Sequence, residues 1–337
     1  MTNTPKRFLI SGLTLIAAIA IVAPSASARK KNKKQKQTVE TVQPVLPVKD
    51  NVIVVAATVN PDIPKKTKFA GQTVDLDRID MYERLDRELT SMMYTHGNTL
   101  LTLKRANRYF PIMAPILKAN DVPEDLLYLA CIESYLNPRA VSGAKAAGFW
   151  QFMPATAKEY GLEVNDYVDE RFDPEKSTEA ACRYLRNAYK KYGNWESAAA
   201  SYNGGMGRIS RELESQQAES AYDLWLVDET SRYMFRLLAM KMIMEDPTKY
   251  GFRLRADQLY NPIEFDIVEV DQPVEDWPAW AKDHGINFMV LRELNPWIRS
   301  KSLPNKDGKT YRVRLPKDKS MKRDKQKVRV YNPNWIK

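Results

Sequence analysis

Apolar residues recur at every third or fourth position through the middle of the chain. The spacing is clear in "LDRIDMYERLDREL" and in "ANRYFPIMAPILKAN", and it continues from Leu76 to about Pro247. This period places apolar side chains on one face of a helix. The pattern therefore predicts a helical domain, whose bounds we set at residues 71–251.

Residues typical of helix ends punctuate this domain. The segment 123–136 opens with a proline and two acids, and it stops before Pro138. A second helix is expected to start at Pro174 behind Asp173 as its cap, and to end at Gly193. The sequence thus predicts the bounds of these two helices.

The pattern changes at about residue 252. Two β-prone runs, "IEFDIVEV" and "KTYRVRLP", enclose the helical stretch "DWPAWAKDHGINFMVLRELNP". This order predicts a small α+β module over residues 252–316. The fold class expected for the whole chain is mainly α.

The beginning of the chain has the composition of a targeting segment. Lys6 and Arg7 precede an apolar run of 16 residues, and "APSASA" then offers a cleavage site after Ala28. Residues 1–28 are therefore predicted to be a secretory signal peptide. The run is shorter than the about 20 residues of a membrane-spanning helix. No cysteine lies at the cleavage point, so we expect export to the periplasm or cell envelope without a lipid anchor.

Basic residues gather at both ends of the chain. Residues 1–36 and 317–337 each carry eight Lys or Arg, against no acid and two acids, which leaves 37–316 with a net charge of −4 although the whole chain has +10. We expect a linker over 29–70 and a basic tail over 317–337. Such tails are usually solvated arms; the alternative is non-specific binding to an anionic envelope polymer or membrane surface. Export makes nucleic acid an unexpected partner.

The sequence has no pattern typical of a metal site or a nucleophilic triad. Its two histidines, His96 and His284, lie far apart without a partner pattern. Cys131 and Cys182 both fall in predicted helices, where a disulfide and two buried thiols fit an exported protein equally well. We expect no metal and no cofactor.

One acid lies within an apolar helical run. Glu133 falls in the last turn of the predicted helix 123–136, beside Leu129 and Ile132. Apolar surroundings and the negative end of a helix both disfavour ionisation, so a raised pKa is expected. A carboxyl that keeps its proton near neutral pH can donate it to a glycosidic oxygen. The alternative is a structural glutamate that is hydrogen-bonded to the next loop.

The loop after Glu133, "SGAKAAGFWQFMP", favours the first interpretation. Its small residues let a polymer approach the backbone, and its aromatic, amide and thioether side chains suit sugar rings and acetamido groups.

These residues resemble the catalytic signature of the lytic transglycosylases of glycoside hydrolase family 23, the soluble lytic transglycosylase domain, and most of all the membrane-bound lytic transglycosylase D group. The signature is matched at Glu133, Ser134, Asn137, Pro138, Ser142, Ala146, Gly148, Trp150, Gln151, Phe152, Met153, Pro154 and Thr156. Later motifs, "DERFDPEKSTEAACRYL", "YGNWESAAASYNGG" and "ETSRY", extend the resemblance over about residues 75–250. Lys145 stands where the family usually has glycine. We expect its side chain on the loop surface; the alternative is a positive charge at the substrate cleft.

The resemblance implies a lysozyme-like, all-helical catalytic domain and lytic transglycosylase activity on peptidoglycan strands. It implies that Glu133 cleaves the MurNAc-β-1,4-GlcNAc bond as an acid and then, as a base, closes a 1,6-anhydro ring on MurNAc. Further family positions, implied to contact or position the substrate, are Ser142, Gln151, Met153, Tyr202, Asn203 and Glu229.

The C-terminal module resembles a degenerate LysM repeat. The usual opening Gly-Asp-Thr-Leu is replaced by "DQPVEDW", so glycan binding and simple packing on the catalytic domain fit the module equally well. Two other functions fit the whole chain: a hydrolase of the goose-type lysozyme kind, and a non-catalytic wall-binding protein.

Overall fold

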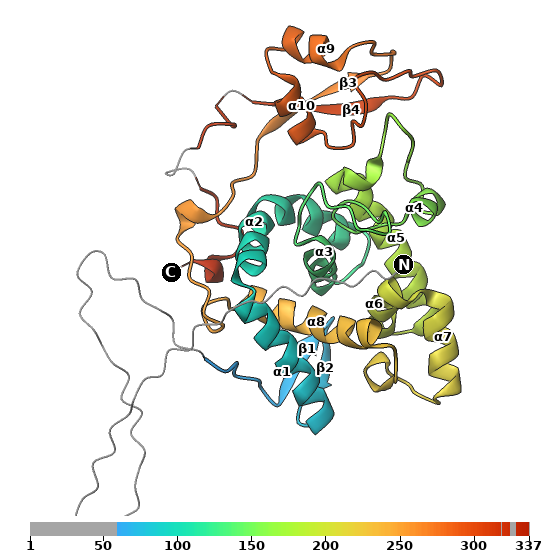
Figure 1. The fold of residues 1–337 in the computed structure, drawn as a ribbon, viewed down its shortest axis with the longest axis vertical. Coiled ribbons are helices and arrows are strands. Elements are labelled where there is room, and N and C mark those ends of the chain that lie inside the picture. The colour runs from blue at the N-terminus through green and yellow to red at the C-terminus, as the bar shows by residue number, and fades with distance from the viewer. Residues whose placement is uncertain (1–58, 318, 324–327, 337) are drawn as a thin grey trace, which may run out of the picture. The chain divides into compact units, whose positions relative to one another are not determined.

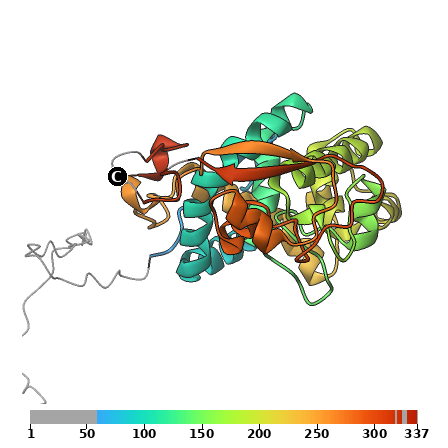
Figure 2. The same ribbon diagram turned by 90° about the horizontal axis from the view of Figure 1, so that it is seen from above.

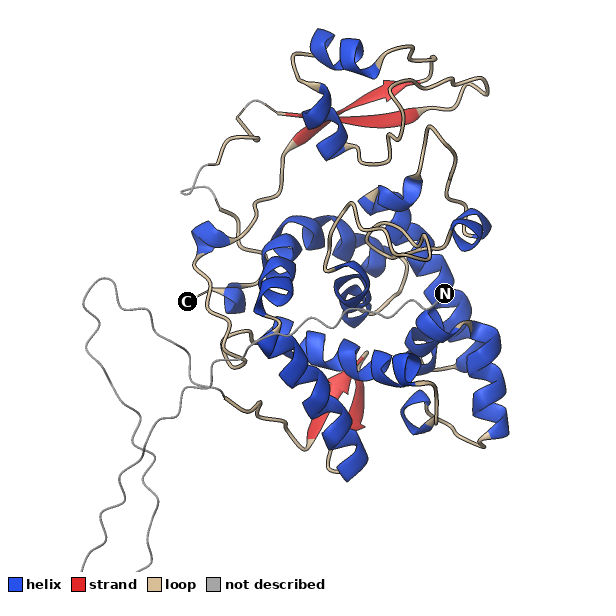
Figure 3. Ribbon diagram, viewed as in Figure 1, coloured by secondary structure: helices blue, strands red, loops and turns tan. Residues whose placement is uncertain are grey.

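The computed structural model describes residues 59–317, 319–323 and 328–336. The predicted signal peptide and most of the predicted linker lie outside these residues. Helices dominate the described part of the chain, and strands form two short antiparallel pairs (Figure 3). The predicted fold class, mainly α, is confirmed. None of the described helices is long and apolar enough to cross a membrane.

The helical domain is shown in Figure 1. Its α-helices are α1 (Ile79–Tyr94), α2 (His96–Ala119), α3 (Leu127–Ser134), α4 (Pro154–Glu159), α5 (Pro174–Tyr192), α6 (Trp195–Gly204), α7 (Met206–Ser215) and α8 (Asp228–Glu245). Short 3-10 helices include η1 (Glu124–Leu126), η2 (Glu170–Phe172) and η3 (Ala221–Asp223).

Helix α8 forms the centre of the domain core. Phe235 and Leu238 on this helix are fully buried. Its Arg232 donates a 2.7 Å hydrogen bond to the buried Glu88 of α1, which fixes the two helices to each other. The helix therefore has little freedom to move relative to its neighbours, and this matters for the side chains that it presents.

The predicted helix ends are largely confirmed. Asp173 caps α5 by accepting hydrogen bonds from two backbone amides of the first turn, and Gly193 ends the helix with a φ of 73°. The helix expected over 123–136 is shorter than predicted, because its first turn is η1. At its other end Tyr135 and Leu136 adopt left-handed backbone conformations, which stop α3 at Ser134.

A β-hairpin stands where the sequence predicted the end of a linker. Strands β1 (Lys66–Phe69) and β2 (Gln72–Asp75) pair through a turn at Ala70–Gly71, where both residues have positive φ. Two such residues match the twist of a tight hairpin. Phe69 is buried, and the Ala70 amide donates to Asp125 at 2.7 Å. The predicted linker 29–70 is therefore wrong over its last residues, and the domain is not entirely helical.

The C-terminal module has the predicted strand, helix, helix, strand order. Strand β3 (Phe265–Val270) pairs with β4 (Tyr311–Pro316) in an antiparallel register that joins Val270 to Tyr311. Figure 2 shows the two strands side by side, next to the helices α9 (Trp277–Asp283) and α10 (Phe288–Leu294). Trp277 and Leu291 fill the core of the module. The predicted α+β character is confirmed.

Part of the predicted basic tail packs on the helical domain. Residues 328–336 include the short 3-10 helix η6 (Pro333–Trp335), and Trp335 is only 2% exposed. Its indole donates a 2.6 Å hydrogen bond to the carbonyl of Met244. The Tyr331 amide donates to Asn107 on α2. The expectation of a solvated arm is wrong for these residues, because their apolar side chains find a partner surface.

The two cysteines do not form a disulfide. Cys131 on α3 and Cys182 on α5 are both buried free thiols. Burial raises the pKa of the Cys131 thiol well above its ordinary value, so both behave as small apolar core residues.

Candidate active site

Glu133 lies in the last turn of α3, where a tyrosine of α8 holds it. The Tyr233 hydroxyl donates a 2.6 Å hydrogen bond to Glu133 Oε1. Arg236, one turn further along α8, donates to the Ile132 carbonyl at 3.0 Å and so satisfies a free carbonyl at the end of α3. Tyr233 thus orients the carboxyl group, while Arg236 fixes the end of α3 to the same helix.

The pKa of Glu133 is raised above its ordinary value. Burial of the carboxyl is the largest cause, and the negative charge of Glu229 acts in the same direction. The hydrogen bond from Tyr233 and the positive charge of Arg236 lower the pKa and oppose these effects. The predicted direction is confirmed, with burial as the main cause. The carboxyl therefore sits between groups that favour its protonated form and groups that favour its anion.

The α3–α4 loop (residues 135–153) follows Glu133 and is tied down at three places. The Ser134 hydroxyl donates to the Phe149 carbonyl at 2.8 Å. The buried Trp150 donates from its indole to Thr178 of α5 at 2.9 Å, and its carbonyl accepts a 2.8 Å hydrogen bond from the Tyr202 hydroxyl of α6. Three helices thus fix the position of one loop.

Arg171 of η2 forms a fourth tie. Its buried guanidinium pairs with Asp169 at 2.7 Å and donates to the carbonyls of Lys145 and Phe152 at 2.8 and 2.9 Å. Gly148 approaches the same element so closely that a Cβ at this position would lie 1.8 Å from the Arg171 carbonyl oxygen, and its φ is +77°. Only glycine fits there. The loop thus rests directly on η2.

Two of the predicted site residues in this loop, Ser142 and Gln151, form hydrogen bonds within the loop. The Ser142 side chain accepts a hydrogen bond from the Ala146 amide at 3.0 Å, and Ser142 is exposed. Gln151, with a φ of 48°, donates to the Gly148 carbonyl at 2.9 Å. Met153 directly precedes α4 and is 43% exposed. These contacts shape the loop and leave the Met153 side chain free to meet a ligand.

The remaining predicted residues lie at the ends of α6 and α8. Burial and, after it, the charge of Glu133 raise the pKa of Tyr202, and the charge of Glu229 acts to raise the pKa of Glu133, so these groups interact electrostatically. The Tyr202 hydroxyl itself donates to a loop carbonyl and makes no hydrogen bond to Glu133. Asn203, beside Tyr202 on α6, is half-buried. Glu229 is exposed in the first turn of α8.

Tyr233 was not predicted as a partner of Glu133. The signal was present in the motif "ETSRY", where Tyr233 follows Glu229 by four residues and therefore lies on the same face of a helix. Only the acid of this motif, Glu229, was predicted as a site residue.

The described residues offer no alternative centre built on a metal. No group of three or more His, Cys, Asp or Glu side chains is arranged to hold an ion within the described ranges.

A cavity of about 1520 Å³ lies away from Glu133, where Lys104 and Arg108 of α2 face residues 257–264, and no predicted site residue lines it. The chemistry available at Glu133 is proton transfer by one carboxyl group.

Comparison with known proteins decides the family of this site. Residues 111–224 match the family described as the transglycosylase SLT domain, and this span includes Glu133, Gln151 and Tyr202. This segment is a transglycosylase SLT domain. Residues 266–319 match the soluble lytic transglycosylase C-terminal LysM-like domain, so the α+β module is a LysM-like domain. The predicted family resemblance is confirmed for both parts of the chain.

Two relatives of this chain are named lytic murein transglycosylases. Membrane-bound lytic murein transglycosylase D of Escherichia coli K12 is 32% identical over 240 residues, which cover 70% of this chain and 51% of that protein. Membrane-bound lytic murein transglycosylase C of Yersinia enterocolitica is 31% identical over 131 residues, 35% of this chain and 37% of that protein. The chain thus spans about half the length of the first relative.

Among solved structures, the 70 kDa soluble lytic transglycosylase of Escherichia coli is similar to 49% of this chain, over 34% of its own length, with 21% identity and a TM-score of 0.37.

Proposed function

We propose that this SLT domain protein is a peptidoglycan lytic transglycosylase. Its substrate is the MurNAc-β-1,4-GlcNAc bond of the glycan strand, and its product ends in 1,6-anhydro-MurNAc. The observation that carries the proposal is the geometry of Glu133, a carboxyl with a raised pKa that Tyr233 holds at 2.6 Å inside an SLT domain.

In the first step Glu133 acts as the general acid. Its proton moves to the glycosidic oxygen, the bond between this oxygen and C1 of MurNAc breaks, and GlcNAc leaves as an alcohol. The raised pKa of Glu133 favours the protonated form that this step requires. The positive charge that develops at C1 is stabilised by the acetamido group of the sugar itself.

In the second step the same residue acts as the base. The 6-hydroxyl of MurNAc attacks C1, and its proton returns to the Glu133 carboxylate, which restores the starting state. The nucleophile belongs to the sugar that is being cleaved, so its effective concentration is high. No water is consumed, and one carboxyl group serves both steps, where most glycosidases use two.

Tyr233 has a positioning role in this cycle. Its hydrogen bond is made to Oε1, which leaves Oε2 to carry the transferred proton. A hydroxyl donor stabilises the carboxylate more than the acid, so Tyr233 stabilises the anion that remains after the first transfer. Arg236, which also lowers the pKa of Glu133, contributes in the same direction.

The substrate strand lies between the α3–α4 loop and the ends of α6 and α8 in this proposal. Ser142, Gln151 and Met153 form the loop side, and Asn203 and Glu229 form the other side. The exposure of Met153 supports contact with a sugar ring. The Tyr202 hydroxyl, which donates a hydrogen bond to the Trp150 carbonyl, stabilises the shape of the loop side.

The proposed location is the periplasm or cell envelope, because residues 1–28 have the composition of a signal peptide. The excess of basic residues in 317–323 supports a salt-sensitive attraction to anionic envelope surfaces.

The product distinguishes this proposal from hydrolysis. The full chain is incubated with purified peptidoglycan, and the released fragments are weighed by mass spectrometry. Anhydro fragments, lighter by one water than the corresponding reducing sugars, are expected. Fragments that carry the extra water would make the protein a lysozyme-like hydrolase, and an absence of fragments would leave a wall-binding protein.

A further inference from the structure

The LysM-like domain holds a segment of the SLT domain within its own core. Val168, between α4 and η2, is 1% exposed and belongs to the apolar cluster of the LysM-like domain. It forms a β-bridge with Ile298, while the Asp169 amide donates to the Trp297 carbonyl at 2.9 Å. Neither part of the chain completes this contact alone.

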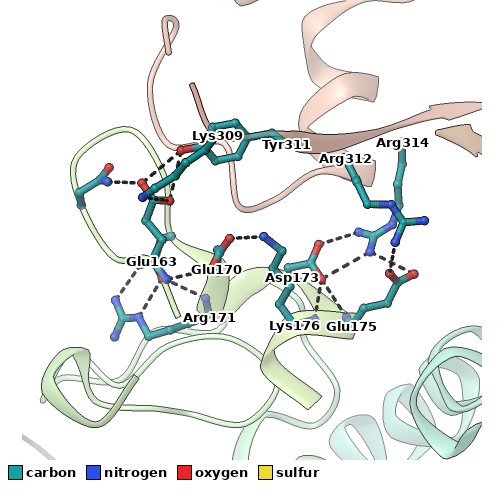
Figure 4. A network of polar contacts seen from close by, with 12 residues as sticks. Glu163, Glu170, Arg171, Asp173, Glu175, Lys176, Lys309, Tyr311, Arg312 and Arg314 are labelled. Atoms are coloured by element: carbon teal, nitrogen blue, oxygen red, sulfur yellow. Dashed lines mark hydrogen bonds and ion pairs between the residues drawn. The ribbon is translucent and has the colours of Figure 1, made fainter. Parts of the chain in front are cut away.

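Polar contacts from β4 and from Lys309, just before this strand, hold the SLT segment on both sides of Val168 (Figure 4). The Tyr311 hydroxyl lies 3.2 Å from a Glu163 carboxyl oxygen, and Lys309 forms an ion pair with the same carboxylate. On the other side Arg314 pairs with Asp173 at 3.0 Å and with Glu175 at 3.3 Å. The segment between Glu163 and Glu175, which contains η2, is thus held at both ends.

Arg314 is itself held rigidly. Its guanidinium is buried against Asp173, and its backbone amide and carbonyl are both hydrogen-bonded to the buried side chain of Asn295, at 2.8 Å each. Asp173 is also the cap of α5. A buried pair of charges is weak evidence for stability, but breaking one leaves an uncompensated charge and disturbs its surroundings. Any disturbance here acts directly on η2.

The α3–α4 loop rests on the same η2. Arg171 binds the carbonyls of Lys145 and Phe152, and Gly148 packs against the Arg171 backbone. The loop also contacts the LysM-like domain directly, since Arg139 of the loop forms an ion pair with Glu293 of α10. Contacts therefore run without interruption from the LysM-like domain, through η2, to the loop that follows Glu133.

We propose that the LysM-like domain is a positioning element for the α3–α4 loop, and that Arg314 acts on this loop through η2 and Arg171. The domain is thus part of the machinery that shapes the cleft, whether or not it binds glycan itself. The inference rests on the proposed function only where it assigns the loop to substrate binding.

Hydrogen exchange of the full chain tests this coupling. The variant Arg314→Met removes the charged group from β4 and keeps its apolar length. The control Lys317→Met removes a charge from the same domain, where Lys317 forms a 3.3 Å ion pair with the exposed Asp266. In Arg314→Met we expect amide exchange in residues 140–152 to accelerate at least about tenfold, because local opening becomes easier. The control should match the wild type.

Turnover provides the second measurement. In Arg314→Met the Michaelis constant for purified peptidoglycan should rise by a larger factor than kcat falls. The substitution disturbs the loop that binds substrate in the proposed function, whereas Glu133 belongs to α3 and keeps its position. If Arg314→Met does not fold, Tyr311→Phe, which removes only the hydroxyl that contacts Glu163, replaces it and is judged by the same loop exchange.

Exchange in residues 140–152 that stays at the wild-type rate, while residues 163–175 open, would overturn the proposal. Exchange is read without any turnover. A protein that releases no anhydro fragments but shows coupled exchange would refute the proposed function and keep this inference. A protein that releases anhydro fragments but shows no coupled exchange would keep the proposed function and refute this inference.

Discussion

Tyr233 of α8 donates a 2.6 Å hydrogen bond to Glu133 of α3, across 100 residues of sequence. The bond joins the carboxyl to the helix at the centre of the domain core. It fixes which carboxyl oxygen is free, and it favours the anion against the burial that favours the acid. The reactivity of Glu133 in the proposed mechanism therefore depends on a balance that single substitutions can shift in either direction.

Glu133→Gln should abolish the release of anhydro fragments. The amide has the shape of the acid but cannot transfer the proton, and loss of general acid–base catalysis lowers the rate by at least about 100-fold. The measurement is fragment release from purified peptidoglycan, with circular dichroism to verify the fold. A folded variant that keeps the wild-type rate would remove Glu133 from the catalytic role.

The stability of Glu133→Gln relative to wild type should depend on pH. The folded-state pKa of Glu133 is raised, so its contribution to the free energy of unfolding is present below the ordinary pKa and is lost as the pH rises through the raised value. The glutamine has no such loss. Melting temperatures of the two proteins, compared at increasing pH, should shift in favour of the variant; a constant difference would mean that the pKa is not raised.

Tyr233→Phe and Glu229→Gln should move the pH profile in opposite directions. The first step needs protonated Glu133, so kcat/KM falls as the pH rises through its pKa. Removing the Tyr233 hydrogen bond moves this fall to higher pH, and removing the Glu229 charge moves it to lower pH. The shift in Glu229→Gln should shrink at high salt, since Glu229 is exposed. Shifts of the same sign in both variants would contradict the assignment.

Tyr202→Phe should lower stability as well as activity. Its hydroxyl satisfies the carbonyl of the buried Trp150, and a buried carbonyl left without a partner costs about 1–3 kcal/mol. We expect a lower melting temperature and a higher Michaelis constant for peptidoglycan. An unchanged melting temperature together with a lower kcat would instead place the Tyr202 hydroxyl at the reacting groups.

Trp335→Ala should destabilise the protein although Trp335 lies in the basic tail. Its side chain is 2% exposed and packs on the helical domain, and removing a buried tryptophan costs about 3–5 kcal/mol. The control is Met321→Ala in the same tail, where the side chain is 43% exposed and the expected change stays within about 0.5 kcal/mol. Equal denaturant midpoints for both variants would show that the tail is not part of the folded domain.

Local signals in the sequence determined most of the helices. A cap such as Asp173 and a terminator such as Gly193 act within a few residues, so their effect on α5 could be predicted and is confirmed. The hairpin at residues 66–75 was missed, because a four-residue strand gives too short a pattern beside a lysine-rich segment. The packing of Trp335 was missed for another reason, since composition describes the charge of the tail and not the surface that it meets.

The apolar environment of Glu133 could be predicted from the sequence, because its own helix consists largely of buried apolar residues such as Leu129 and Ile132. The groups that oppose this burial could be identified only in the folded protein, since Tyr233 and Arg236 belong to α8. The tertiary structure also decided that the LysM-like domain takes Val168 into its core. Hydrogen bonds and packing act over a few ångströms in space, and periodicity along the chain carries no information on which distant segments fold to within that range.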